Sequence, residues 1–538
     1  MTAATKTAPR VLISDALSPA AVAIFKDRGV SVDVKTGLAK ADLIKIIGEY
    51  DGLAIRSSTK VDADLLAAAP KLRVVGRAGI GVDNVDIRAA TARGVIVMNT
   101  PFGNSITTAE HAISMMMALA RQIPEADRST RASKWEKSRF MGVELFGKTL
   151  GVIGCGNIGA IVADRAQGLK MRVIAFDPFL SPARAMELGV TKVELSELLT
   201  RADFITLHTP LTDQTRNILD EKNLAKTKKG VRIVNCARGG LIDEKALLAA
   251  LKSGHVAGAA LDVFEVEPAK NNPLFDADNV ICTPHLGAAT TEAQENVALQ
   301  VAEQMADYLL NDAVANAVNF PSITAEEAPR LKPFAKLCES LGSFAGQLTM
   351  AAEREHGPIK GIEVEYCGQV ATLNTKPLTA VTIANVLKWH MGDGINMVSA
   401  KELAETRGIA IKEVKSGKFG AYESYVKVTL ITNSPRSVGG TVFSDGRPRF
   451  IQVRGINMEF EAMPHMLYIQ NHDKPGFVGR FGTLMGTNGV NIATFNMGRD
   501  TPGGEAICIV AIDEPVKDNV LSAVKSLEGV KSAALLKL

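Results

Sequence analysis

The amino-acid sequence predicts an α/β protein with two parallel-sheet lobes, followed by an α+β domain and a smaller α+β unit. Short apolar runs alternate with helical patterns from about residue 10 to residue 310, and strands that alternate with helices form parallel sheets. Beyond Phe320 apolar and polar residues alternate, which is typical of half-exposed strands. The 538 residues are too many for one hydrophobic core, so three or four domains are expected.

Four apolar runs predict the strands of the first lobe: 11–15, 52–56, 72–76 and 95–99. A helical pattern from Ser18 to Gly29 lies between the first two runs, beginning with a capping residue and ending at a glycine. Arg56, Arg77 and Asn104 lie at or just after strand ends, where an open parallel sheet binds its ligands. These three side chains are therefore candidates for binding a ligand, although a single arginine could equally lie on the solvated surface.

A long helical pattern from Ser105 to about Trp135 leads into the second lobe. The predicted strands of this lobe begin at Thr149 and continue at 171–177, 203–210, 231–238, 256–264 and 280–285. One long helix, from Thr290 to Leu310, then returns the chain to the first lobe. Two lobes joined by long helices leave a cleft between them, and we expect the functional site there.

A glycine-rich turn follows the strand that begins at Thr149. Gly154, Gly156 and Gly159 have the G-x-G-x-x-G spacing, which permits a tight turn, close approach of a pyrophosphate, and close packing of helix on strand. The helix that follows offers free N–H groups to the phosphates. Asp177 ends the next apolar run, where its carboxylate can bind both ribose hydroxyls and would repel a 2′-phosphate. The predicted cofactor is NAD rather than NADP.

Three residues near strand ends of the second lobe could supply the remaining chemistry. When hydride passes to a nicotinamide, the protein must hold the substrate and move one proton. Arg238 suits a carboxylate, and His285 can take the proton from a hydroxyl. Glu267 can accept a hydrogen bond from the other imidazole nitrogen and set its tautomer. Taken singly, each has an ordinary explanation, as a surface ion pair, a loop cap or a solvated acid.

The C-terminal part is predicted to hold two further domains. Alternating strands are expected at 362–367, 425–431, 441–443 and 449–454, with a hairpin turn at Asp445-Gly446. From His465 to Leu538 the order is strand (466–470), helix (475–487), strand (491–497), strand (505–512), helix (517–527) and strand (530–536). This β-α-β-β-α-β order is that of a ferredoxin-like unit.

Composition excludes several other classes of protein. A net charge of +3 with 22% charged residues favours neither nucleic-acid binding nor an acidic tail. We expect no metal, because the six cysteines form no C-x-x-C pair; a disulfide framework is also not expected, and Cys155 and Cys236 are predicted to be buried small residues. The first nine residues lack a hydrophobic signal core and no apolar run could span a membrane, so a cytoplasmic protein without membrane partners is expected.

Several motifs, in a specific order, resemble those of the D-isomer-specific 2-hydroxyacid dehydrogenases. These are the glycine turn and the segments Gly76–Asp86, Asn99–Ser105, Asn235–Glu244, Ala260–Pro268 and Pro284–Ala288. The resemblance covers about residues 8 to 320. The segments His472–Gly479 and Gly489–Ile492 resemble an ACT domain, a regulatory module. An intervening domain followed by an ACT domain is the layout of the long members of this family that act on 3-phosphoglycerate.

The resemblance implies a domain division and an activity. The implied domains are a substrate-binding lobe (8–103 and 288–318), an NAD-binding Rossmann lobe (104–287), an intervening domain (319–458) and an ACT domain (464–538). The implied reaction is oxidation of 3-phosphoglycerate to 3-phosphohydroxypyruvate with NAD, the entry step of L-serine biosynthesis. Members of the family are commonly homo-oligomers, so a dimer or tetramer is expected.

The resemblance also implies roles for individual residues. Arg238, Glu267 and His285 are implied to be catalytic, and Arg56, Arg77 and Asn104, with Arg238 and His285, to bind the substrate phosphate and carboxylate. The implied cofactor contacts are Gly154, Gly156, Asn157, Ile158, Gly159, Asp177, Thr209, Cys236, Ala237, Arg238, Asp262, His285, Leu286, Gly287 and Ala288. Many members carry threonine where this chain has Ile80, so a hydroxyl contact there is lost. Asn471, Asp473 and Asn491 lie where relatives bind serine.

Alternatives remain open at this point. Other members of the family reduce hydroxypyruvate or glyoxylate, or oxidise D-lactate, but these generally lack the two C-terminal domains. Formate dehydrogenases typically have glutamine in place of Glu267. An NAD-sensing corepressor on the same scaffold can keep the arginine, glutamate and histidine without turning over a substrate. The ACT-like domain could also serve only to assemble subunits.

Overall fold

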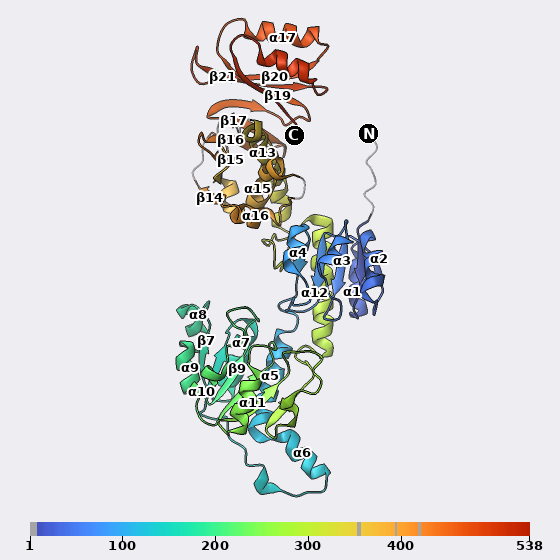
Figure 1. The fold of residues 1–538 in the computed structure, drawn as a ribbon, viewed down its shortest axis with the longest axis vertical. Coiled ribbons are helices and arrows are strands. Elements are labelled where there is room, and N and C mark those ends of the chain that lie inside the picture. Colours follow the sequence, from blue (N-terminus) through green and yellow to red (C-terminus); the bar gives the residue numbers. More distant parts are fainter. Residues whose placement is uncertain (1–7, 352–356, 393–394, 418–420) are drawn as a thin grey trace.

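The computed structural model describes residues 8–351, 357–392, 395–417 and 421–538. The nine-residue start that was predicted to lack a signal core therefore lies mostly outside the described residues. Four sheets follow one another along an elongated molecule, with the second lobe at one end and the last sheet at the other (Figure 1). No helix among the described residues is long and apolar enough to cross a lipid bilayer.

The first lobe is a five-stranded parallel sheet in the order β2-β1-β3-β4-β5. Its elements are β1 (Arg10–Ile13), α1 (Pro19–Asp27), β2 (Ser31–Val34), α2 (Lys40–Ile46), β3 (Gly52–Ile55), α3 (Ala63–Ala67), β4 (Val74–Arg77), α4 (Ile87–Ala92) and β5 (Ile96–Met98). The four predicted strands are present. The edge strand β2 was missed because its residues are largely exposed and carry no apolar run.

The second lobe is a seven-stranded parallel sheet in the order β12-β11-β10-β9-β6-β7-β8. Its strands are β6 (Thr149–Ile153), β7 (Arg172–Phe176), β8 (Thr191–Lys192), β9 (Phe204–Leu207), β10 (Val231–Asn235), β11 (Val256–Leu261) and β12 (Val280–Cys282). The helices that follow β6 are α7 (Asn157–Gly168), α8 (Pro182–Glu187), α9 (Leu195–Arg201), α10 (Glu221–Lys226) and α11 (Glu244–Lys252). The strand order reverses between β6 and β9, and ligands bind at such a reversal in doubly wound sheets.

The prediction of one long helix from Ser105 to about Trp135 is wrong. The structure has two helices, α5 (Ser105–Arg121) and α6 (Ile123–Arg131), separated at Gln122, which adopts a left-handed conformation with φ of 51°. Pro124 explains the break, since its ring would clash with the carbonyl one turn earlier and it has no N–H to donate. The last predicted turn, up to Trp135, lies outside any helix.

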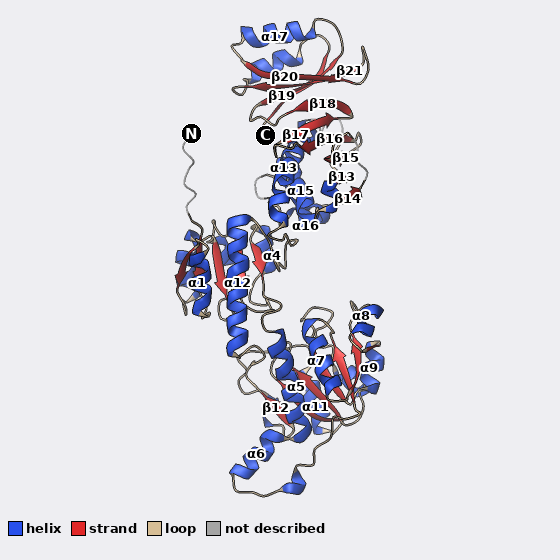
Figure 2. Cartoon of the chain, turned by 180° about the vertical axis from the view of Figure 1, so that it is seen from behind, coloured by secondary structure: helices blue, strands red, loops and turns tan. Residues whose placement is uncertain are grey.

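Helix α12 (Thr291–Asn311) returns the chain to the first lobe and packs along its sheet, as Figure 2 shows. The fit is close at Gly76 of β4, where a Cβ atom would lie 2.2 Å from the sulfur of Met305. The chain therefore crosses between the lobes twice, just before α5 and just before α12.

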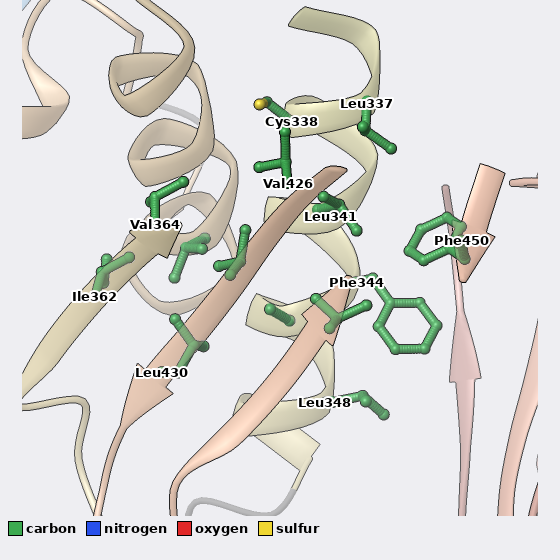
Figure 3. Packing of buried hydrophobic residues seen from close by; sticks show 14 of the residues in the cluster. Leu337, Cys338, Leu341, Phe344, Leu348, Ile362, Val364, Val426, Leu430 and Phe450 are labelled. Atoms are coloured by element: carbon green, nitrogen blue, oxygen red, sulfur yellow. The ribbon is translucent and has the colours of Figure 1, made fainter. Parts of the chain in front are cut away.

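The third sheet has six strands in the order β14-β13-β15-β16-β17-β18. The elements are α13 (Glu327–Ala351), β13 (Gly361–Gly368), α15 (Lys376–Met391), α16 (Ala400–Thr406), β14 (Ala410–Ser416), β15 (Ser424–Ile431), β16 (Arg436–Val442), β17 (Pro448–Val453) and β18 (Ile456–Phe460). The predicted strands are present, and Gly446 forms the expected hairpin turn with φ of 76°. Figure 3 shows α13 packing its Leu341 and Phe344 against β15 and against Phe450 of β17.

The last sheet has the order β20-β21-β19-β22, all antiparallel. Its elements are β19 (Met466–His472), α17 (Phe477–Thr487), β20 (Ile492–Arg499), β21 (Glu505–Ile512), α18 (Asp518–Lys525) and β22 (Val530–Leu536). This is the predicted ferredoxin-like unit. The two helices cover one face, whereas Met466, Tyr468 and Ile509 on the other face belong to the same buried cluster as Phe450.

The predicted fold class is therefore confirmed, with two parallel-sheet lobes followed by two α+β units. The described residues also form short 3-10 turns: η1 (Ile47–Glu49), η2 (Lys137–Arg139), η3 (Pro273–Asp276) and η4 (Gln369–Thr372). The six cysteines are unpaired, and both Cys155 and Cys236 are buried as predicted.

Candidate active site

Polar residues gather at the carboxyl edge of the second-lobe sheet. Thr209 follows β9, Arg238 follows β10, Asp262 follows β11 and His285 follows β12. Because these strands are parallel and adjacent, their carboxyl ends lie at one edge of the sheet. This is the edge at which the sequence placed the candidate catalytic residues.

His285 and Glu267 form a hydrogen-bonded pair. Nδ1 of His285 lies 2.7 Å from Oε2 of Glu267, and the other carboxylate oxygen accepts from the Phe264 amide at 3.0 Å. Burial alone would raise the pKa of Glu267, but the hydrogen bonds from His285 and the Phe264 amide outweigh it and hold the pKa below its usual value. A carboxylate at Nδ1 favours the tautomer with hydrogen on Nδ1, which leaves Nε2 free to accept a proton.

Arg238 reaches across to the first lobe. Its Nε donates to Oδ2 of Asp83 at 2.9 Å, and Nη1 donates to the Ala237 carbonyl at 2.7 Å. Gly81 makes room for this guanidinium, because a Cβ there would lie 1.7 Å from Nη2 of Arg238. Asp83 thus occupies one side of the arginine that the sequence suggested for a substrate carboxylate. Asp83 lies within the Gly76–Asp86 motif, but nothing in the sequence indicates this contact with Arg238.

Arg77 of β4 is a largely buried cation beside this pair. Its Nε is buried and has no hydrogen-bond partner among the described residues, and Nη1 donates only a long bond, 3.3 Å, to the Ala78 carbonyl. Burial, helped by repulsion from Arg238 and Arg56, lowers the pKa of Arg77 to about 10. Repulsion among three cations near one another is relieved when an anion binds. This group of arginines is therefore suited to an acidic ligand.

Asn104 and Arg56 complete the first-lobe part of the site. Asn104 directly precedes α5, and its Oδ1 is likewise buried without a partner in the described part of the chain. The loop that carries Arg56 is held by two residues that were not among those predicted from the sequence. Asp15 accepts from the Arg56 amide at 2.7 Å, and the Asn84 side chain donates to the Arg56 carbonyl at 2.7 Å. Both contacts join residues far apart in sequence, so no local pattern signals them.

The glycine turn between β6 and α7 has the shape that a dinucleotide requires. Gly154 has φ of 90°, and a Cβ on Gly159 would lie 2.0 Å from the Gly154 carbonyl oxygen, so only glycine lets the helix approach the strand this closely. A Cβ on Gly156 would meet nothing within 4 Å, which leaves space above the turn at the start of the 12-residue helix α7. The space and the free helix N-terminus fit a pyrophosphate.

Asp177 follows β7 beside this turn. Its Oδ2 accepts from the Cys155 amide and its Oδ1 from the Phe179 amide, both at 2.8 Å. Each oxygen keeps a further lone pair for a ribose hydroxyl. The other residues expected at the cofactor follow strands of the same sheet or open α7; they include Asn157, Ile158, Thr209, Cys236, Ala237, Asp262 and His285 to Ala288.

Asp262 is the most buried acid of the site. Its carboxylate accepts from the Thr283 hydroxyl at 2.6 Å and from the Leu286 and Gly287 amides at 2.7 and 2.9 Å. Burial would raise the pKa of Asp262, but these bonds and His111, whose Nε2 lies 3.2 Å away, hold the pKa below its usual value.

His111, Cys236 and Asp262 each place one atom that could bind a metal within 4.8 Å of the others. Asp262 already accepts several hydrogen bonds, and His111 Nε2 is 3.3 Å from the Thr283 hydroxyl. The geometry therefore fits a hydrogen-bonded network.

The three residues suggested for an effector make separate contacts within one chain. Asn471 is fully buried and donates to the His472 carbonyl, whereas Asp473 is paired with Arg499 at 2.6 Å. Asn491 donates to Asp513. Asn471 and Asp473 lie at the end of β19, and Asn491 lies just before β20.

Family models match three segments of the chain. The NAD binding domain of the D-isomer specific 2-hydroxyacid dehydrogenases matches residues 113–287. The intervening domain of D-3-phosphoglycerate dehydrogenase matches residues 330–454, and the ACT domain matches residues 465–529.

Curated relatives are similar over nearly the whole chain. A D-3-phosphoglycerate dehydrogenase from Archaeoglobus fulgidus is 42% identical over 533 residues, covering 98% of this chain and 100% of the relative. One from Bacillus subtilis is 41% identical, covering 98% and 99%. Among solved structures, a glyoxylate reductase from Paecilomyes thermophila is 30% identical with a TM-score of 0.55, and the chains overlap over 58% of this one and 99% of that one.

The chain belongs to the D-isomer-specific 2-hydroxyacid dehydrogenase family, and its cofactor is NAD. Both the fold and the predicted cofactor agree with this family. Within the family, the full-length similarity and the two C-terminal domains place the chain among the D-3-phosphoglycerate dehydrogenases. The resemblance suggested by the sequence motifs is confirmed.

Proposed function

We propose that the protein oxidises 3-phospho-D-glycerate to 3-phosphohydroxypyruvate with NAD, the first step of L-serine biosynthesis. The observation that carries this proposal is full-length similarity to curated D-3-phosphoglycerate dehydrogenases, at 40 to 42% identity. The reaction needs a proton acceptor, a site for two anionic groups and a nicotinamide. The described residues include candidates for the first two and a fitting site for the third.

In the proposed reaction, Nε2 of His285 takes the proton of the substrate C2 hydroxyl. Glu267, bonded to Nδ1 at 2.7 Å, keeps the imidazole in the required tautomer and stabilises the imidazolium that forms. Bound NAD supplies the carbon that accepts the hydride from C2. The loss of one proton and one hydride converts the hydroxyl-bearing carbon to a ketone.

Arg238 is proposed to bind the substrate carboxylate, and Arg56, Arg77 and Asn104 the remaining anionic group. The support for Arg77 is that its buried Nε has no hydrogen-bond partner in the described part of the chain, so that an anionic ligand would supply one. Asp177 is proposed to bind the adenosine ribose. The division into a substrate lobe (8–103 and 288–318), an NAD lobe (104–287), an intervening domain (319–458) and an ACT domain (464–538) is part of the same proposal.

We also propose that two copies associate through the second lobe. Trp135, Met141 and Phe146, in the segment after α6, are 79%, 74% and 72% exposed. Ile123 at the start of α6 is also largely exposed. Large apolar side chains clustered on one segment are typical of a surface that a partner covers. A dimer through this segment is expected, with a tetramer as the larger possibility. The molecular mass measured by analytical ultracentrifugation at several protein concentrations distinguishes both from a monomer.

L-Serine is proposed as a feedback effector that binds the ACT domain. The support is the ACT family match over 465–529 together with the product relation of serine to the proposed reaction. Asn471, Asp473 and Asn491 are the proposed contacts.

The test is an assay of initial rates with 3-phosphoglycerate and NAD, with and without serine. We expect NADH formation that follows 3-phosphoglycerate concentration, and a lower rate when serine is present. The same assay with glycerate and with D-lactate separates this activity from those of other family members. No turnover with any of these substrates, despite NAD binding, would favour the sensor alternative and refute the proposed function.

A further inference from the structure

The loop that carries His285 has an unusual backbone conformation. His285 has φ of 55°, in the left-handed region that residues with side chains rarely adopt. Its amide donates to the Asp262 carbonyl at 2.9 Å. A conformation of this kind persists only where surrounding contacts hold it in place. The position of the imidazole therefore depends on what fastens residues 283 to 287.

Asp262 fastens the loop on both sides of His285. Its buried carboxylate accepts from the Thr283 hydroxyl before the histidine, and from the Leu286 and Gly287 amides after it. A Cβ on Gly287 would lie 3.3 Å from both Asp262 Oδ2 and the Thr108 methyl group, so the loop is closely enclosed there.

Helix α5 supplies further contacts that hold the 283–287 loop. Thr108 and His111 lie one turn apart and so share a face of the helix. The Thr108 hydroxyl is 2.8 Å from the Gly287 carbonyl oxygen. Nε2 of His111 is 3.2 Å from Asp262 Oδ1 and 3.3 Å from the Thr283 hydroxyl. The helix thus contacts the loop directly at Gly287 and indirectly through Asp262.

The same helix begins at the crossing between the lobes. Asn104, a candidate substrate ligand, is the residue before α5. Thr107 lies 3.5 Å, hydroxyl to hydroxyl, from Thr290, which caps α12 at the second crossing. The first two turns of α5 therefore touch both crossings and the His285 loop.

We propose that His111 and Thr108 are positioning residues, which hold the strained 283–287 loop so that His285 is fixed relative to the crossings between the lobes. Neither residue is assigned a contact with substrate or cofactor. This inference rests on the proposed function, because it concerns the residue that takes the proton in that reaction.

The first test compares His111→Leu with His111→Gln. The glutamine amide can donate from about the position of Nε2, whereas leucine fills space without donating. We expect kcat for 3-phosphoglycerate oxidation to fall about tenfold in His111→Leu, as when an outer hydrogen-bond partner of a functional group is lost, and to be largely restored in His111→Gln. The KM for NAD and for 3-phosphoglycerate should change by less than about twofold.

The matched control is His255→Leu. His255 also hydrogen-bonds a threonine in the second lobe, with Nε2 3.1 Å from the Thr227 hydroxyl. It precedes β11, whereas Asp262 follows β11, so His255 lies at the end of the strand opposite to the proposed site. We expect its kcat to equal that of the unmodified protein. If His111→Leu fails to fold, Thr108→Val against Thr108→Ser asks the same question, with loss of kcat expected only in the valine variant.

A second measurement does not depend on turnover. Hydrogen exchange of the Leu286 and Gly287 amides should be faster in His111→Leu than in the unmodified protein, because the carboxylate that accepts from them is less firmly held. Unchanged kcat together with unchanged exchange would overturn the inference. If the unmodified protein does not oxidise 3-phosphoglycerate, the proposed function fails, while the exchange measurement still decides whether α5 holds the loop.

Discussion

The ion pair between Arg238 and Asp83 predicts that removing one acid improves substrate binding. In the structure Asp83 occupies Nε of Arg238 at 2.9 Å, and a substrate carboxylate must compete for the same guanidinium. Asp83→Asn removes the competing charge at nearly constant shape. We therefore expect the variant to have a lower KM for 3-phosphoglycerate.

The magnitude follows from the exposure of the pair. The Asp83 side chain is 65% exposed and the contact is a single hydrogen bond, so the pair is worth about 0.5 to 1 kcal/mol. That free energy corresponds to a KM lowered about two- to fivefold. Because solvent ions screen an exposed pair, the difference in KM between Asp83→Asn and the unmodified protein should shrink as ionic strength rises.

The assay is initial rates over a range of 3-phosphoglycerate at saturating NAD, at low and at moderate salt. Asp312→Asn is the matched control, since Asp312 pairs with Arg73 at the same 2.9 Å and with similar exposure, away from the site. Its KM should not change. A higher KM in Asp83→Asn would refute the reasoning, because it would mean that Asp83 orients Arg238 for the substrate instead of competing with it.

Three further predictions concern single residues of the second lobe. His285→Ala should lower kcat by a factor of about 10² to 10⁴ with NAD affinity nearly unchanged, as measured by steady-state rates and cofactor titration; normal turnover would remove His285 from the mechanism. Asp177→Ala should weaken NAD about tenfold and relax discrimination against NADP, seen in the ratio of kcat/KM values for the two cofactors; an unchanged ratio would contradict the ribose contact. Burial lowers the pKa of His208 to about 4, and its Nδ1 is buried without a partner among the described residues. As the pH falls, His208 is therefore protonated in the unfolded chain before it is protonated in the folded one. The free energy of unfolding decreases as the pH falls from about 6.5 toward 4. At pH 5 the buried neutral His208 lowers the free energy of unfolding by roughly 2 kcal/mol relative to neutral pH. The urea midpoint should therefore fall less between pH 7 and pH 5 in His208→Gln than in the unmodified protein. Equal falls in the two proteins would show that His208 is not the cause of the loss of stability.

Much of the fold could be predicted because its signals are local. The strands of both parallel lobes are short, buried and apolar, and the last unit shows the correct order of strands and helices. The errors occur where the local signal is weak or misleading. The exposed edge strand β2 has no apolar run, and the helical pattern after Ser105 continues through Gln122, where Pro124 interrupts the helix.

The candidate site divides in the same way. Residues carried by motifs, such as Arg238, Glu267 and His285, could be selected from the sequence because each follows a predicted strand. The partners of those residues could not. Asp83 of the first lobe meets Arg238 across 155 positions of the chain. His111 on α5 meets Asp262, which follows β11 in the same lobe, so both contacts depend on the tertiary fold.

The shared core of the last two sheets has a consequence for studying regulation. Met466, Tyr468 and Ile509 of the final unit lie in one apolar cluster with Phe450 and Phe460 of the preceding domain. Cutting the chain near residue 460 would expose that cluster to water, and the truncated protein would be prone to self-association. The two units are expected to melt in one transition, and a ligand that stiffens the last sheet also stabilises the strands before it. Point substitutions at the surface therefore suit serine-response experiments better than truncation.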